Sequence, residues 1–522
     1  MKEDYNISVG SRVLCQNYVG TVKYIGQVEG YDGEWIGMDW DDAERGKHNG
    51  VVNGKQYFTT RYPKSGSLVR RNKINVGVEF VDALGRRYLH KTDAEYLNPV
   101  LLEECRKVLN TVSFEVVGLN KVGKKQSNLD KLVNICLPGE KISYVNTKKL
   151  NGLCPSAEEL SLNHNLISNW RTVADIIEAM PCLRLLDLSK NILDFNEKDL
   201  SQFEGKFKSL KSFALCFGNL TFDNAISISK MMPGLIELKL AKNNITSLRT
   251  LDDNLFANIK ELNLDANDIC DWKEVEKLGH LKNLEILLIS EIKLKEISLP
   301  ECKENEKCDI FVNLRHLSIS YNEIDNWRSI SELNKLKSLK SLGFLGNAVS
   351  EGISYLERWS QVVSRVLGLT HLDHAEIFYE ERRGAEYDLL KQHGMAWAQS
   401  CDDPILRKKF VDEINSYPAL ITRYGAPETS LCEKPTLPKS KLLTVTITNT
   451  RDSKKIIKKL PVKMTVQSLL GLIQKCFDTG NNVPTLYYIS PSNPGSKIQL
   501  DNVTKNLNYF SLQDNDTIVA EW

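Results

Sequence analysis

Apolar residues recur along residues 153–349 in one short pattern that appears eight times. Each copy places apolar residues at its first, fourth and sixth positions and a turn residue at its ninth. One full copy is formed by Leu183, Leu186, Leu188 and Asn191. Since Leu186 and Leu188 alternate, they point to the same face of an extended segment and can both be buried. The pattern therefore predicts one short strand per copy, repeated about every 25 residues.

The ninth position carries asparagine in most copies. An amide there can pair with backbone groups that would otherwise stay unsatisfied inside the turn. The asparagines are Asn165, Asn191, Asn243, Asn267, Asn322 and Asn347. Gly218 and Ile292 replace asparagine in the third and sixth copies, so we expect local irregularity there. The period is typical of a leucine-rich repeat, which predicts an α/β solenoid over residues 151–375 that is capped at both ends.

Three tryptophans each follow an asparagine of the pattern by five residues: Trp170, Trp272 and Trp327. A role in packing under the helix of each repeat is favoured over a role in ligand binding.

The pattern changes before the repeats. Between Ser8 and Asn75 the chain is rich in glycine and β-branched residues, with strand-like runs at 12–14, 20–24 and 35–40, which predicts a small β-barrel. Its segments GEWIGMDWD, RGKHNG, VNGKQYF and GSLVR resemble a CAP-Gly domain. This resemblance implies binding of the C-terminal Glu-Glu-Tyr or Glu-Glu-Phe tail of α-tubulin and related proteins.

The chemistry of the GKHNG segment supports a peptide site. Gly46 and Gly50 allow tight turns and close backbone approach, and between them lie a lysine that can donate to carboxylates and two polar side chains. The candidate peptide-binding residues are Trp35, Lys47, His48, Asn49, Phe58, Leu68 and Arg70. Taken singly, Trp35 and Phe58 fit the domain core as well as a wall for a terminal aromatic ring. Together with the glycine-framed lysine, the set favours binding.

The groove departs from the common CAP-Gly pattern. Asn49 stands where aspartate is common, Leu68 where an aromatic residue is usual, and Gly30 at an often aromatic position next to Tyr31. A less aromatic pocket predicts weaker affinity for the tail.

The segments around the repeats are less regular. The run VGVEFVDALGRRYL, residues 76–89, has strand character, and 98–109 is predicted to be a short helix that begins near Pro99. Lys121, Lys124 and Lys125 form a basic cluster that we interpret as a solvated turn. Residues 130–150 are predicted to cap the repeats at the N-terminal end, and a helical run from Glu376 to cap the other end.

A proline-rich stretch, residues 425–440, predicts a linker. Beyond it come a strand at 442–448, a second at 454–459, a helix capped by Thr465 and a last strand at 517–522. This order resembles a ubiquitin-like β-grasp domain. The segment ends on Trp522 without a diglycine, which predicts docking rather than conjugation. The predicted segments are 1–80 CAP-Gly, 81–150 connection and N-terminal cap, 151–375 repeats, 376–424 C-terminal cap, 425–440 linker and 441–522 ubiquitin-like, a multidomain α+β chain.

Composition narrows the classes of function that the chain can have. The 522 residues contain 68 Lys and Arg against 67 Asp and Glu, so no global field attracts nucleic acid or a membrane. The start has no apolar signal segment, and no long apolar run occurs, which predicts a cytoplasmic protein. The 12 cysteines are scattered, and Cys302 and Cys308 lack partners for a zinc site, so we expect no metal and no cofactor. The GKHNG loop lacks a phosphate-loop frame, and no catalytic grouping is evident, so we expect no enzyme.

The order of the three domains, with GKHNG and ERRGAEYD as local marks, resembles the tubulin-folding cofactor E family of chaperones. The resemblance implies that the chain binds α-tubulin, acts with cofactors B, C and D in assembling and dissociating the αβ heterodimer, and is associated with the cytoskeleton. The ubiquitin-like domain adds the proteasome as a candidate partner. The alternative is a microtubule-end adaptor that binds Glu-Glu-Tyr/Phe tails, although such adaptors usually carry coiled coils and no sustained heptads appear here.

Overall fold

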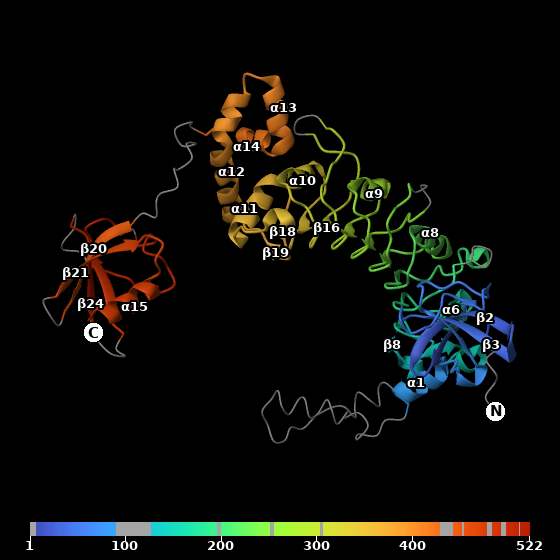
Figure 1. The fold of residues 1–522 in the computed structure, drawn as a ribbon. Coiled ribbons are helices and arrows are strands. Elements are labelled where there is room, and N and C mark those ends of the chain that lie inside the picture. Colours follow the sequence, from blue (N-terminus) through green and yellow to red (C-terminus); the bar gives the residue numbers. More distant parts are fainter. Residues whose placement is uncertain are drawn as a thin grey trace. The chain divides into compact units, whose positions relative to one another are not determined.

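The computed structural model describes residues 7–89, 127–195, 200–250, 255–302, 306–427, 442–450, 454–477, 483–491, 497–510 and 512–522. The chain divides into two compact units, Met1–Pro427 and Glu428–Trp522 (Figure 1). The predicted helix at 98–109 and the lysine cluster at 121–125 lie outside the described residues.

The first unit begins with an antiparallel four-stranded sheet in the order β1-β2-β3-β6. Its strands are β1 Arg12–Cys15, β2 Tyr18–Val28, β3 Tyr31–Trp40 and β6 Gly66–Val69, and a small hairpin joins β4 Val51–Val52 to β5 Lys55–Gln56. The core beneath the sheet includes Val13, Val22, Ile36, Met38 and Trp40. All three strand-like runs predicted in this domain are strands, whereas closure into a barrel stays a prediction.

The run at 76–89 differs from its predicted strand. Only β7 Val78–Glu79 is extended, and it pairs with β9 Ile142–Tyr144. The remainder is helix α1 Phe80–Tyr88, whose N-terminus is capped by the Glu79 carboxylate accepting from the Asp82 N–H at 3.1 Å. Its buried residues Phe80, Ala83 and Leu84 follow the three- and four-residue spacing of one helix face. The strand prediction was therefore wrong for residues 80–88.

The repeats contribute one strand each to an 11-stranded sheet in which neighbours in sequence are neighbours in space. The parallel strands are β8 Asn134–Cys136, β10 Glu159–Ser161, β11 Leu185–Asp187, β12 Ser212–Ala214, β13 Glu237–Lys239, β14 Glu261–Asn263, β15 Ile286–Leu288, β16 His316–Ser318, β17 Ser341–Gly343 and β18 His371–Leu372. The last strand, β19 Ala375–Glu376, pairs antiparallel with β18. We call residues 151–375 the repeat array; a solenoid as a whole remains a prediction.

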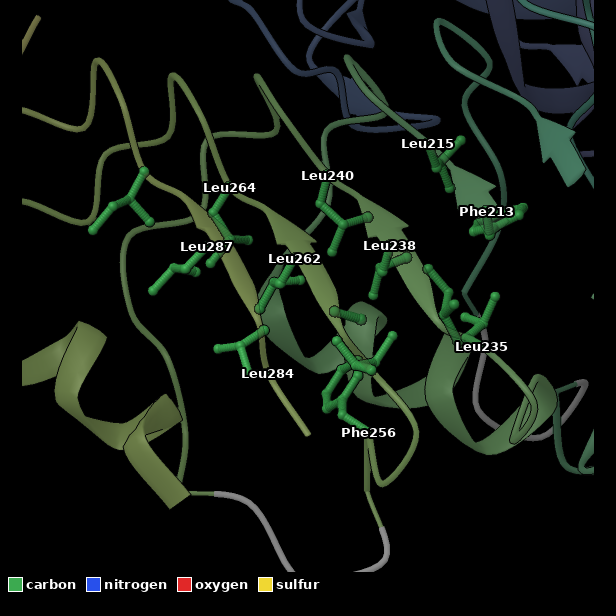
Figure 2. Packing of buried hydrophobic residues seen from close by; sticks show 14 of the residues in the cluster. Phe213, Leu215, Leu235, Leu238, Leu240, Phe256, Leu262, Leu264, Leu284 and Leu287 are labelled. Atoms are coloured by element: carbon green, nitrogen blue, oxygen red, sulfur yellow. The ribbon is translucent and has the colours of Figure 1, made fainter. Parts of the chain in front are cut away.

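Each strand from β10 to β17 buries its central leucine or phenylalanine against the next, as Leu238 does opposite Leu262 (Figure 2). The helices lie along one side of the strand row, where α8, α9 and α10 are visible (Figure 1). They are α5 Thr147–Leu150, α6 Trp170–Ala179, α8 Phe222–Met231, α9 Trp272–Glu276, α10 Trp327–Glu332 and α11 Tyr355–Arg365, with 3-10 turns Leu129–Lys131, Ser201–Phe203, Lys277–His280, Leu333–Lys335 and Ala348–Ser350. The buried side chains of the strands and those of the helices belong to one continuous core.

The three tryptophans begin helices α6, α9 and α10, each after a capping Asn or Asp. Trp170 packs against Phe207 and Phe213, and Trp272 packs against Phe311 at a centroid distance of 6.2 Å. The packing role is therefore confirmed.

The six asparagines of the pattern are all buried. Asn243 is typical: its Oδ1 accepts from the Gly218 N–H at 2.6 Å, and its Nδ2 donates to the carbonyl oxygens of Leu215 and Leu240 at 2.8 and 3.0 Å. The strands of the third and sixth copies, β12 and β15, nevertheless keep the register of their neighbours. The irregularity lies in the turns, where the residue after the ninth position, Asn219 or Lys293, is also left-handed, with φ +58° and +64°. The fourth copy shares this feature at Asn244.

Three helices follow the last strands: α12 Tyr379–Ser400, α13 Pro404–Glu413 and α14 Tyr417–Tyr424. The buried Glu386 carboxylate accepts from Arg423 Nη1 at 3.0 and 3.1 Å and from the Tyr424 hydroxyl at 2.6 Å, which ties α12 to α14. The helix predicted from Glu376 therefore starts three residues later and runs on to Ser400.

The second unit has a five-stranded sheet in the order β21-β20-β24-β22-β23. Its elements are β20 Leu442–Asn449, β21 Lys455–Pro461, helix α15 Val466–Phe477, β22 Thr485–Ile489, β23 Ile498–Gln499 and β24 Thr517–Glu521. The first and last strands pair in parallel at the centre, and α15 buries Val466, Leu469 and Ile473 in their core. The Thr465 hydroxyl accepts from the Ser468 N–H at 3.2 Å, so the predicted cap is confirmed.

Candidate peptide-binding site

The GKHNG loop is fixed by close contacts with the domain's own backbone. The Lys47 N–H donates to the Gly66 carbonyl at 2.7 Å, and the Gly66 N–H donates to the His48 carbonyl at 2.8 Å. A Cβ atom on Gly66 would lie 2.3 Å from the His48 oxygen, and one on Gly50 would lie 1.9 Å from the Phe58 oxygen. Gly50 also has φ +94°, a conformation that side chains disfavour. Gly50 and Gly66 therefore let two segments of the chain touch, whereas the sequence suggested that Gly50 lets the backbone approach a ligand.

A charge network stiffens the chain beside this loop. The buried Asp39 carboxylate accepts from Arg61 Nε at 2.9 Å and from the Ser65 hydroxyl at 2.6 Å. Arg61 also donates to Asp41 at 2.8 Å, and Arg12 donates to Asp41 at 2.7 Å. Burial alone would raise the pKa of Asp41, but hydrogen bonds and charge from the two arginines outweigh it and lower that pKa.

A groove of about 380 Å³ opens between the loop and strands β3 and β6. Its walls combine aromatic rings, aliphatic side chains and cationic groups, which is the mixture that an acidic peptide with an aromatic residue requires. The lining residues are Cys15, Gln16, Tyr31, Trp35, Trp40, Arg45, Lys47, His48, Val52, Ser67, Leu68, Val69 and Lys73.

His48 has a defined tautomer. Its Nδ1 accepts from the Gly50 N–H at 3.0 Å, so the neutral ring carries its proton on Nε2. Burial lowers the pKa of His48, which keeps the ring neutral at pH 7. His48 thus offers one N–H donor, and it lines the same groove as Lys47.

Residues 9–74 match the CAP-Gly domain family. Tubulin-specific chaperone E of Drosophila melanogaster is 33% identical over 98% of this chain and 98% of its own length. The human protein of that name is 32% identical over the same shares. The chain belongs to the tubulin-specific chaperone E family. The solution structure of the C-terminal ubiquitin-like domain of mouse tubulin-specific chaperone e aligns with a TM-score of 0.16 and 27% identity, covering 17% of this chain and 94% of that one.

For this member of the tubulin-specific chaperone E family, four of the seven predicted site residues lie together in the groove: Trp35, Lys47, His48 and Leu68. The other three do not line it. Phe58 is buried and packs edge-on beneath His48, at a centroid distance of 5.9 Å. Asn49 is exposed, and its Oδ1 accepts from the Val51 N–H at 3.3 Å.

Arg70 does not line the groove but stacks on Trp35, which does. Its guanidinium carbon lies 3.7 Å from the centre of the Trp35 ring, and its Nη1 donates to the Glu34 carbonyl at 3.2 Å. This stacking holds Trp35 in place. Phe58 and Arg70 are therefore supports of the site in this structure, one below the loop and one behind the tryptophan.

Sequence reasoning missed several lining residues. Tyr31 packs edge-on against Trp35 at 5.8 Å and restores an aromatic group one position after Gly30. Arg45 lies over the Tyr18 ring at 4.5 Å and donates to Gln16 at 2.9 Å, and Lys73 lies across the groove. The alternation of β3 could have identified Tyr31, because Tyr31 and Trp35 are an even number of residues apart.

Within the described residues, no helix is long and apolar enough to cross a membrane. The same part of the chain holds no group of three or more His, Cys, Asp and Glu side chains placed to bind a metal ion.

Proposed function

We propose that this chain is a tubulin-folding chaperone that captures the acidic C-terminal tail of α-tubulin in the groove of its first domain. The observation that carries the proposal is the convergence of Lys47, His48 and Trp35 on one groove in a member of the chaperone E family. The cationic and N–H donors suit carboxylates, and Trp35 with Tyr31 suits a terminal aromatic ring.

The repeat array is proposed to hold the folded body of α-tubulin. Stable protein interfaces bury on the order of 1,600 Å², and a groove of about 380 Å³ accommodates only a short peptide. Tail capture then raises the effective concentration of the body near the array, because both contacts belong to one chain.

The ubiquitin-like domain is proposed to dock a further protein. Other tubulin-folding cofactors (B, C and D) and the proteasome are the candidate partners. In this scheme the chain acts with those cofactors in both assembly and dissociation of the αβ heterodimer, in the cytoplasm and in association with the cytoskeleton.

The tail contact is tested by titrating an α-tubulin tail peptide with a free C-terminal carboxylate into the chain by calorimetry. Lys47→Ala should weaken affinity about tenfold, or roughly 1.5 kcal/mol, because a charge-assisted bond is lost at an open groove. Affinity should also fall as salt rises. Lys23→Ala is the matched control, since Lys23 is exposed on β2 and does not line the groove. Equal affinity for the Lys47 variant and the wild type would contradict the assignment.

Two deletions test the separate roles of the first domain and the repeat array. Each deleted chain is mixed with purified heterodimer and the partner cofactors, and the release of β-tubulin is measured. Removing residues 1–75 should weaken α-tubulin binding without abolishing it, whereas removing 153–349 should abolish dissociation. Dissociation by the second deletion would show that the repeats are only a spacer. Co-sedimentation adds the remaining distinction, since a microtubule-end adaptor would be enriched on polymer and a chaperone would stay with soluble α-tubulin.

A further inference from the structure

One edge of the repeat array carries a basic and aromatic surface that the groove does not include. In every copy, the residue before the asparagine position adopts a left-handed conformation, with φ between +53° and +66°. These residues are, in chain order, His164, Lys190, Phe217, Lys242, Ala266, Glu291, Tyr321 and Gly346. The residue at this position has the same backbone conformation in each copy, so its side chain is what differs there between copies.

The second, third and fourth copies form a compact group that we call the Phe217 cluster: Lys190, Phe217 and Lys242. The Lys190 ammonium lies 5.2 Å from the centre of the Phe217 ring, and the Lys242 ammonium lies 5.4 Å from it. Both distances are within the range of a cation–π contact. Among the described residues, neither ammonium has a carboxylate within ion-pair distance. Two like charges thus share one ring, with no ion-pair partner for either in the part of the chain that the structure describes.

Phe217 itself is not explained by folding. Phe217 is 49% exposed, so it adds little to the core, and a left-handed conformation is unfavourable for a non-glycine residue. Glycine would fit this position at lower cost, as Gly346 does in the last copy. An isolated exposed lysine is ordinary on a solvated loop. An exposed ring between two lysines that form no ion pair with any described residue is not.

The neighbouring copies set the limits of this basic surface. On one side lies His164, whose pKa is lowered by burial and lowered further by the charges of Lys141 and Lys190. On the other side Ala266 interrupts the row, and the next copy presents Glu291. The positive region therefore extends from the second to the fourth copy, and the sixth copy presents a negative charge.

We propose that the Phe217 cluster binds an acidic, extended polypeptide segment of a partner protein. Alternate side chains of an extended segment are about 7 Å apart, so carboxylates two residues apart can reach the ammoniums on either side of one ring. The ring supports the two lysines and offers an apolar face to the intervening part of the segment. This contact does not rest on the proposed tail contact, because it needs no terminal carboxylate.

The experiment measures binding of a probe peptide of about twelve residues to the full chain by fluorescence anisotropy at low salt. The probe alternates Glu and Ser, is acetylated and amidated at its ends, and is paired with a Gln-Ser peptide of the same length. We expect the Glu-Ser peptide to bind and the Gln-Ser peptide not to bind. Lys190→Ala with Lys242→Ala should weaken the Glu-Ser affinity about tenfold, and Phe217→Ala about threefold.

The matched control is Lys230→Ala with Lys273→Ala, which removes the same charge from exposed positions on helices α8 and α9. Equal losses for the two double variants would reduce the effect to net charge and overturn the proposal. Loss of probe binding in Lys47→Ala would place the peptide in the first domain and would also overturn it. Failure of the free-carboxylate tail to respond to Lys47→Ala would refute the tail contact and leave this measurement unaffected.

Discussion

The first domain and the repeat array hold their chains by different means. In the first domain, the site depends on single glycines that allow backbone segments to touch, and on one buried carboxylate, Asp39, that gathers Arg61 and Ser65. In the array, stability is spread over many equivalent leucines and buried asparagines. We therefore expect a substitution at one of these contacts in the first domain to cause a large loss of stability and of peptide binding. A substitution in the repeat array should cause a smaller loss of stability.

The largest effect is expected for Gly50→Ala. A Cβ at this position would lie 1.9 Å from the Phe58 carbonyl oxygen, and φ is +94°. Left-handed strain and overpacking each cost on the order of 1–3 kcal/mol, so we expect a loss of about 3 kcal/mol or more and loss of tail-peptide binding. Denaturant unfolding followed by tryptophan fluorescence, with calorimetric titration of the peptide, measures both.

Gly54→Ala is the matched control for this prediction. Gly54 also has a positive φ, +77°, but an added Cβ would have no atom within 4 Å. It should show the conformational cost alone, about 1 kcal/mol. Similar losses for the two variants would mean that close backbone contact does not define the loop.

This contrast also explains what could be predicted from the sequence. Periodic features were predictable: the strand of each copy, the burial of Asn243 and the packing of Trp170 all follow from spacing. The groove was predicted from the CAP-Gly resemblance and from the chemistry of the GKHNG segment. The contacts that support its residues were not predicted. That Phe58 lies under His48, and that Arg70 stacks on Trp35, depends on segments brought together by the sheet, and no local pattern encodes such contacts.

Some predicted elements were wrong for a related reason. Residues 80–88 form a helix because Phe80, Ala83 and Leu84 meet the core of the repeat array. Seen without that core, the same apolar residues suggest a strand. The irregularity expected at Gly218 is limited to the turn, where Phe217 and Asn219 are both left-handed, because the ladder on both sides of β12 sets the backbone of the strand.

The next prediction tests the graded behaviour of the array. Asn243→Leu removes an amide that accepts from Gly218 and donates to the Leu215 and Leu240 carbonyls. Leaving these buried backbone groups unpaired should cost roughly 1 to 3 kcal/mol. Thermal and denaturant unfolding of the full chain measures the loss. Asn283→Leu is the control, because its exposed amide makes one bond, to Ala257, and should cost less than about 1 kcal/mol. A melting temperature of Asn243→Leu equal to wild type would show that the turn does not need the amide.

The smallest effect concerns acid stability of the first domain. Asp41 has a pKa below its ordinary value of 3.8, because Arg12 and Arg61 outweigh the opposite effect of burial. The folded state therefore binds fewer protons than the unfolded state, and the contribution of this carboxylate is present above pH 3.8 and is lost as pH falls through the lower folded pKa. The side chain is 40% exposed, so solvent screening limits that contribution to under about 1 kcal/mol.

In denaturant unfolding, wild type should exceed Asp41→Asn in stability at pH 6, and the difference should shrink as pH falls below 4. Asp32→Asn, at an exposed position with no ion pair among the described residues, should show no such convergence. A difference between wild type and Asp41→Asn that stays constant from pH 6 down to pH 2 would show that the arginines hold the loop through hydrogen-bond geometry, and that the charge of Asp41 contributes nothing.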